Sequence, residues 1–265
     1  MKKHIKIKQL LLQYGPLGSI LTALLLLANT ASTSFAQALP PDIHPFGLSY
    51  QEWAVKWLQW SFSLSTNNLE LVGSPDIHCG DGSKVQFLAG VYIPGNNGIT
   101  IETRKVTVDP GTPLFFSVLD SQDDNSGCNG NELDFATNTI SELLGTAAGN
   151  WSYVTSTACT VDGVPVRGLS DPATTPYLVI TPPYSYTTAK EGNVVANLYG
   201  VSCLPGDFTV YPSVAEGVFL MIPPLCPGKH VIEFAGIVGP ATAPYVESDL
   251  TYEITVPRES RCGRN

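Results

Sequence analysis

The densest group of side chains that could do chemistry lies between residues 120 and 134. Its oxygen-bearing residues supply five candidate calcium ligands, which are Asp120, Asp123, Asp124, Asn125 and Asn129. Ca²⁺ takes about six to eight oxygen ligands, and extracellular modules bind it on loops of this composition. The spacing does not fit an EF-hand, because no register places Gly sixth and Glu twelfth. The alternative interpretation is a solvated loop whose side chains form turns and cap a helix.

Carboxylates could also serve a secreted hydrolase or lyase, for which Asp120, Glu132 and Glu233 are the candidates. A glycosidase needs two separated carboxyls with different pKa values, and clustering on one loop does not show such a pair. The chain has no Gly-x-Ser-x-Gly nucleophile motif, no phosphate-binding loop and no dinucleotide-binding glycine pattern. We therefore expect a non-catalytic protein and leave catalytic residues unassigned.

Trp53, Trp57 and Trp60 recur at helical spacing and form an aromatic stripe. Such a stripe suits two roles. Exposed, the rings would form a platform that stacks on sugars and so bind a ligand. Buried, they would form core, since large aromatic side chains at helical spacing usually do. The opposite face carries Leu58 and Phe62, and a helix that is apolar on both faces is normally buried on two sides.

Six cysteines allow fifteen disulfide pairings. Cys203 and Cys226 each shortly precede a Pro-Gly turn at one end of a predicted hairpin, so we expect them to pair. The remaining pairs would then be Cys128 with Cys159, which flank a predicted helix, and Cys79 with Cys262.

Other metal sites have weaker support. Cys226 followed by His230 is a spacing found in copper proteins, but Met221 precedes the cysteine instead of following it. His44, His78 and His230 could hold zinc, although no HxH or HExxH spacing supports this. We expect no resident cofactor apart from calcium.

Residues 1–36 have the pattern of a signal peptide. A lysine-rich start precedes an apolar run over 17–28, and Ser-Phe-Ala at 34–36 supplies the small residues before cleavage. We therefore expect a secreted or periplasmic protein, in a compartment where disulfides persist.

The predicted leader carries four of the 14 basic residues and none of the 23 acidic ones, so the remaining chain has a net charge of −13. Such a surface repels nucleic acid and anionic lipid. No later stretch reaches the roughly 20 apolar residues of a membrane helix, so we expect no membrane span after cleavage.

Residues 37–48 predict an extended entry segment, and 49–265 predict one domain. Ser49 and Glu52 form a capping box that starts the tryptophan helix, and a second helix is predicted over 132–144. Alternating or continuous apolar runs predict strands over 85–92, 99–108, 114–119, 177–180, 194–199, 208–211, 218–222, 230–237 and 249–256. Many short strands punctuated by 24 Gly and 21 Pro indicate a mainly β fold, an antiparallel, jelly-roll-like β-sandwich with an N-terminal helix and one inserted helix.

Several motifs resemble an uncharacterised family of secreted bacterial signal-peptide-containing proteins. They are Gly47–Tyr50 with Glu52, Trp53, Trp57 and Trp60; Phe87–Gly90; Leu114–Asp120; Val161–Val166; and the stretch from Gly217 to Gly236 with its Pro-Gly-Lys-His. The resemblance covers most of the chain after the leader. It implies a secreted domain and brings no catalytic residue.

The leading hypothesis is an exported, non-catalytic domain that binds a carbohydrate or a cell-envelope partner and is stabilised by calcium. The alternatives are a carboxylate-dependent hydrolase or lyase and a structural envelope or matrix protein.

Overall fold

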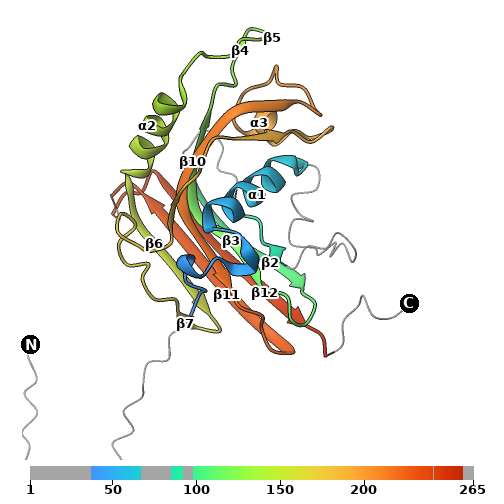
Figure 1. Cartoon of the computed structure of the whole chain (residues 1–265), viewed down its shortest axis with the longest axis vertical. Coiled ribbons are helices and arrows are strands. Elements are labelled where there is room, and N and C mark those ends of the chain that lie inside the picture. The colour runs from blue at the N-terminus through green and yellow to red at the C-terminus, as the bar shows by residue number, and fades with distance from the viewer. Residues whose placement is uncertain (1–36, 67–84, 92–97, 241, 259–265) are drawn as a thin grey trace, which may run out of the picture. The chain divides into compact units, whose positions relative to one another are not determined.

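Twelve strands account for most of the regular structure (Figure 1). The computed structural model describes residues 37–66, 85–91, 98–240 and 242–258, and the predicted leader over 1–36 lies outside them. The strands are β1 (Gln86–Phe87), β2 (Gly98–Thr107), β3 (Leu114–Asp124), β4 (Cys128–Asn129), β5 (Glu132–Leu133), β6 (Val154–Val161), β7 (Val164–Pro165), β8 (Leu178–Ile180), β9 (Tyr184–Thr187), β10 (Thr209–Ile222), β11 (Gly228–Val238) and β12 (Val246–Val256).

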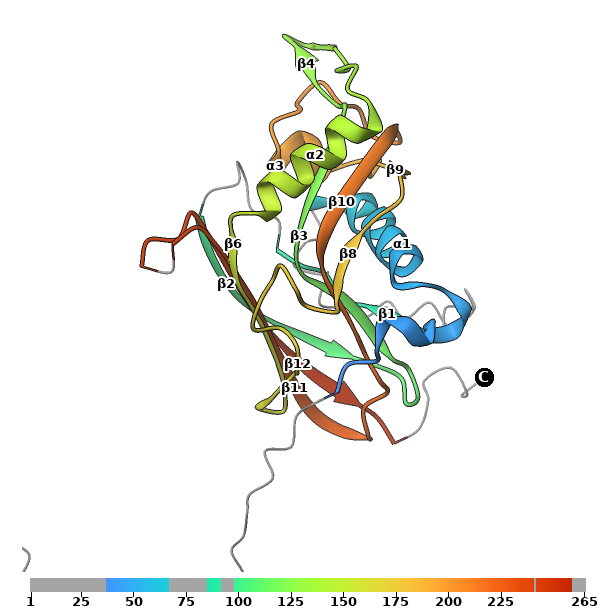
Figure 2. The ribbon, with the colours of Figure 1, turned by 60° about the vertical axis from the view of Figure 1, so that its left-hand side comes forward.

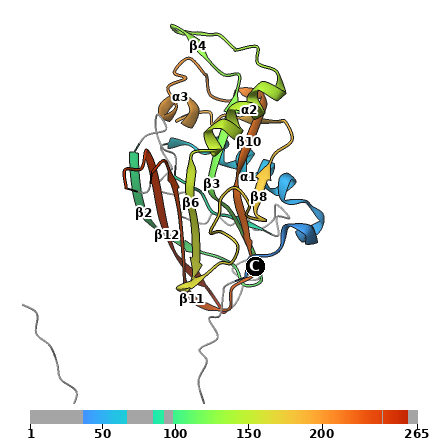
Figure 3. The same cartoon turned by 90° about the vertical axis from the view of Figure 1, so that its left-hand side faces the viewer.

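The strands form two main sheets. The first has the order β1-β3-β10-β8, with β9 also pairing with β10, and the second has the order β2-β12-β11-β6-β7 (Figure 3). The pairs are antiparallel except β1 with β3 and β2 with β12, which are parallel. The predicted mainly β sandwich is confirmed. Strands β4 and β5 form a separate small hairpin.

The core between the sheets is aromatic. Phe116 of β3 stacks on Phe234 of β11 with ring centroids 4.6 Å apart, and Phe234 stacks on Tyr252 of β12. Gly236 of β11 lies against Leu119 of β3, where an added Cβ would be 2.9 Å from the leucine Cβ. The absence of a side chain at Gly236 therefore lets β3 approach the second sheet.

Helix α1 (Tyr50–Ser63) covers the other face of the first sheet (Figure 2). Its predicted capping box is present, because the Ser49 hydroxyl accepts from the Glu52 N–H and the Glu52 carboxylate accepts from the Ser49 N–H. Trp53 packs on Phe115, and Trp57 packs edge-on against Phe219.

Helix α2 (Ile140–Trp151) begins eight residues later than predicted, and Glu132 and Leu133, which were expected inside it, form β5 instead. The cause is a second capping box, in which Thr139 and Glu142 exchange the same hydrogen bonds as Ser49 and Glu52. Gly145, the residue directly after the predicted end of this helix, lies inside α2 and does not end it. Figure 1 shows α2 and α1 on opposite sides of β10.

Residues 194–199, predicted as a strand, contain the short helix α3 (Val194–Leu198). The buried side chain of Asn193 decides this, because its Oδ1 accepts from the N–H groups of Val195 and Ala196. The predicted strands over 208–211 and 218–222 are parts of the single strand β10.

The entry segment contains two single turns of 3-10 helix, η1 (Pro41–Ile43) and η2 (Pro45–Gly47). Among the described residues, no helix is both long and apolar enough to cross a membrane.

Candidate functional site

The tryptophans of α1 belong to the core and form no open binding surface. Trp53 and Trp57 are buried, and their indole N–H groups donate to the carbonyls of Pro45 and Leu88 at 2.9 and 2.8 Å. A ring that stacks on a sugar must expose one face, so the platform predicted from Trp53, Trp57 and Trp60 is not formed. Trp60 is half-buried against other aromatic rings. The core interpretation of the stripe is the one that the structure supports.

The acidic cluster lies mainly on a strand and not on a loop. Asp120, Asp123 and Asp124 all belong to β3, where successive side chains point to opposite faces. The amide of Asn125 is occupied, because it donates to the Asn138 carbonyl and accepts from the Asn138 N–H. Asn129 lies exposed on β4.

The predicted calcium ligands are therefore not assembled. Within the described ranges, no group of three or more His, Cys, Asp or Glu side chains is placed to hold a metal ion. The physical reason is the strand itself, which distributes neighbouring carboxylates along its length and over its two faces.

A cavity of about 660 Å³ runs along the distal half of β3, and we call it the β3 cavity. Six consecutive residues, Leu119–Asp124, line it. Because alternate side chains of a strand point to opposite faces, a cavity lined by all six must wrap around the edge of β3. Of the described strands, only β1 pairs along this edge, and it pairs with Leu114 and Phe115 at the start of β3.

The rest of the cavity wall comes from segments far apart in the sequence. Aromatic side chains are the common feature, and they include Trp151 at the end of α2, Tyr153 before β6, Tyr199 after α3 and Tyr245 before β12. Phe62 of α1 completes them. Tyr153 and Tyr245 are 61% and 55% exposed, so their rings are accessible at the mouth.

Asp120 is the most perturbed acid in the β3 cavity. Burial raises its pKa from 3.8 to about 6, and the nearby Ser117 hydroxyl partly opposes the shift. Asp120 is only partly buried and lines the cavity. Gly217 lies opposite it on β10, and a Cβ there would collide with the Asp120 Cβ. The glycine therefore makes room for the carboxylate.

The other two carboxylates have different surroundings. Burial raises the pKa of Asp123, and the charge of Asp124 raises it further, while a hydrogen bond from Thr146 opposes both. Asp124 is held in place by three donors, namely the Tyr186 hydroxyl at 2.9 Å, the Gln122 amide at 2.8 Å and the Ser126 N–H at 2.7 Å. These three bonds fix Asp124 at the end of β3, whereas Asp120 is affected mainly by burial.

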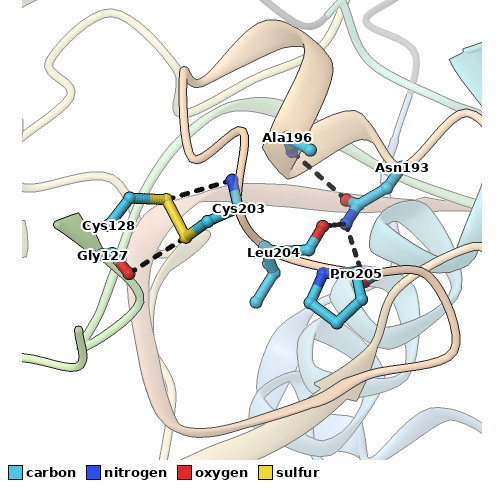
Figure 4. Close-up of a disulfide and its surroundings, with 7 residues drawn as sticks. All are labelled: Gly127, Cys128, Asn193, Ala196, Cys203, Leu204 and Pro205. Atoms are coloured by element: carbon cyan, nitrogen blue, oxygen red, sulfur yellow. Dashed lines mark hydrogen bonds between the residues drawn. A yellow bond between two sulfur atoms is a disulfide. The ribbon is translucent and has the colours of Figure 1, made fainter. Parts of the chain in front are cut away.

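A disulfide joins two segments of the cavity wall (Figure 4). It links Cys128 to Cys203, and each cysteine lies two residues from a residue that lines the cavity, Ser126 and Val201 respectively. The Cys203 N–H also donates to the Cys128 sulfur at 3.1 Å. Asn193 fixes the adjoining loop, because its side-chain amide donates to the carbonyls of Leu204 and Pro205.

The predicted pairs of Cys203 with Cys226 and of Cys128 with Cys159 are wrong. Cys203 and Cys226 lie beyond opposite ends of β10, whose 14 residues span roughly 45 Å, far more than a disulfide bridges. Cys159 is buried in β6, and both Cys159 and Cys226 are free thiols. Cys79 and Cys262 lie outside the described residues, so their predicted pairing stays a prediction.

His230 has a structural partner on each ring nitrogen. Its Nδ1 lies 2.8 Å from the Asp162 carboxylate, and its Nε2 lies 2.7 Å from the Cys226 carbonyl. A ring bonded in this way has no nitrogen left for copper or zinc. His78 lies outside the described part of the chain.

The remaining candidate carboxylates lie away from the β3 cavity. Glu132 is exposed on β5, and Glu233 is on β11, where it accepts a hydrogen bond from the Thr160 hydroxyl at 2.9 Å. Of the candidate acids, the structure therefore places only Asp120, Asp123 and Asp124 in the cavity wall. The aromatic wall was missed, because its members come from helix α1, the junction of α2 with β6, and the segments after α3 and before β12, and no local pattern relates them.

Comparison of the chain with protein-family models, with curated proteins and with solved structures finds no match. The function has to be argued from the β3 cavity.

Proposed function

We propose that this chain is an exported protein that binds a carbohydrate in the β3 cavity. The observation that carries the proposal is the combination, in one open cavity, of aromatic rings with carboxylate and amide oxygens. The sugar site thus differs from the tryptophan stripe that the sequence suggests. The signal peptide predicted over residues 1–36 supports the exported part of this proposal.

The chemistry of the wall suits a sugar because a sugar presents two kinds of surface. Its C–H groups pack on aromatic rings, which Tyr153, Tyr199 and Tyr245 supply. Its hydroxyls donate hydrogen bonds, which the Asp120 carboxylate can accept. A volume of about 660 Å³ is within the range of ligand pockets, roughly 300–1,000 Å³.

Binding has better support than hydrolysis. The raised pKa of Asp120 suits a proton donor, but a glycosidase also needs a second carboxyl about 5–9.5 Å away. Asp124 lies four residues along the same strand, which corresponds to roughly 13 Å. Asp123 is on the opposite face of β3. Neither arrangement places two carboxyls on either side of one glycosidic bond.

The test is to titrate the purified protein with each member of an oligosaccharide panel and to measure binding by calorimetry and by tryptophan fluorescence. Tyr153→Ala should weaken binding of the best ligand at least tenfold, because it removes a ring from the cavity mouth. Tyr211→Ala is the matched control, since Tyr211 is also 61% exposed but lies outside the cavity wall.

Binding that is equally reduced by both tyrosine variants would contradict this assignment of the site. If no oligosaccharide of the panel binds, carbohydrate binding is refuted and a structural role is favoured. Release of shorter sugars that stops in Asp120→Asn would favour the hydrolase.

A further inference from the structure

The charges of the β3 cavity are all of one sign. Its wall contains three carboxyls, Asp120, Asp123 and Asp124, and among the described residues that line it none is Lys, Arg or His. The ion pairs elsewhere in this part of the chain join Arg104 to Glu102, Lys105 to Glu253 and His230 to Asp162, and none reaches the cavity.

Asp120 is therefore partly withdrawn from water, and no cation among the described residues compensates its charge. The causes of its shifted pKa are burial and one hydroxyl, and no positive group contributes. A buried carboxylate without a cationic partner is energetically unfavourable, and a ligand that supplies the positive charge relieves this. The hydroxyls of a neutral sugar donate hydrogen bonds but bring no charge.

The aromatic groups next to Asp120 suit the same ligand. Tyr199 lines the cavity beside Asp120, whose charge is one of the causes that raise the pKa of the tyrosine. Aromatic faces attract ammonium groups through their negative surface, and this attraction is stronger where water is excluded. A carboxylate next to an aromatic ring is a favourable environment for an amine.

We propose that the preferred ligand of the β3 cavity is a sugar with a free amino group, held as an ammonium ion by Asp120. The inference rests on the proposed carbohydrate binding and specifies its ligand class. Neutral sugars fill the same cavity without the ion pair, and acidic sugars are repelled by the three carboxyls.

The experiment compares three oligosaccharide probes of similar size at pH 7 and fixed salt: glucosamine, N-acetylglucosamine and galacturonate oligomers. Calorimetry on the purified protein should give at least tenfold tighter binding of the glucosamine oligomer than of its acetylated counterpart. The galacturonate oligomer should bind most weakly. The acetylated oligomer is the matched control for the glucosamine oligomer, because acetylation removes the positive charge and otherwise adds only a small group.

The variant Asp120→Asn tests the residue. It should reduce the preference for the amine to less than threefold while the acetylated oligomer still binds. Glu233→Gln is the control, because it removes an exposed carboxylate outside the cavity and should leave the preference unchanged. Thermal unfolding of each variant checks that it is folded.

The outcomes separate the two proposals. Equal binding of both glucosamine-based oligomers, or a preference that persists in Asp120→Asn, overturns the ammonium site and leaves carbohydrate binding in place. Failure of every oligosaccharide to bind the folded protein overturns both.

Discussion

A carboxylate that loses its water on folding ionises at a cost in stability, and Asp120 is such a group. Its pKa is about 6 in the folded protein and 3.8 as a free side chain, so between these values the native state binds more protons than the unfolded state. Stability from this group is therefore greatest at low pH and falls as pH rises from about 4 to 6. Above pH 6 the cost reaches at most about 3 kcal/mol.

Asp120→Asn removes this cost while keeping the shape of the side chain. We expect the variant to be more stable than the natural chain at pH 7, by about 1–3 kcal/mol, and to show little difference at pH 4. Urea unfolding at both pH values measures this. A residue that destabilises the fold when ionised is typical of a binding site, so a loss of stability in the variant at pH 7 would count against the assignment.

His230 and Asp162 form an ion pair whose contribution to stability depends on pH. Partial burial alone would lower the pKa of His230, but hydrogen bonds to Asp162 and to the Cys226 carbonyl raise it. Burial alone would raise the pKa of Asp162, but hydrogen bonds from His230 and from the Val231 N–H lower it. The stabilisation from a raised histidine pKa is complete below about pH 6.5 and is lost as pH rises through the folded-state value.

Asp162→Asn should therefore lower the histidine pKa, as measured by NMR titration of the ring protons. The difference in melting temperature between the two proteins should be largest near pH 5–6.5 and should shrink in alkaline buffer. A histidine pKa that does not move in the variant would show that the pair is not coupled.

At the scale of elements, the disulfide links two segments that adjoin the lining of the β3 cavity. Cys128 follows β3 and Cys203 follows α3, and 75 residues separate them in the sequence. A cross-link of this kind typically contributes about 2–4 kcal/mol by restricting the unfolded chain. It also joins the residues next to Ser126 and Val201, which line the cavity.

The double variant Cys128→Ser, Cys203→Ser should therefore lose both stability and ligand affinity. We expect a lower melting temperature and at least fivefold weaker binding of the best oligosaccharide at a temperature where the variant stays folded. Affinity that is unchanged in the folded variant would show that the bridge stabilises the fold without shaping the site.

At the scale of the whole molecule, the cysteines fall into distinct classes of reactivity. Cys226 is exposed and free, while Cys159 is free but buried, and burial with the charge of Glu233 raises the pKa of its thiol. If Cys79 and Cys262 pair as predicted, Cys159 and Cys226 are the two thiols of the chain. Iodoacetamide should label Cys226 in the native protein, Cys159 only after unfolding, and Cys128 with Cys203 only after reduction. Mass spectrometry of the labelled peptides checks this, and rapid native labelling of Cys159 would contradict its burial.

The sequence by itself determined the features that local patterns encode. The Ser49–Glu52 capping box located the start of α1, because its hydrogen bonds lie within one turn. Alternating apolar residues located β11 and β12, because one face of each strand is buried. The capping box of Thr139 and Glu142 is an equally local signal, and it marks the start of α2 eight residues after the start of the helix predicted over 132–144.

Only the tertiary structure decided which residues meet. Strand β10 separates Cys203 from Cys226, and the close approach of the segments after β3 and α3 pairs Cys203 with Cys128. Sheet packing buried Trp53 and Trp57, and the packing around β3 brought Asp120 together with aromatic rings from segments far apart in the sequence. Such contacts depend on long-range packing, and no spacing along the chain records them.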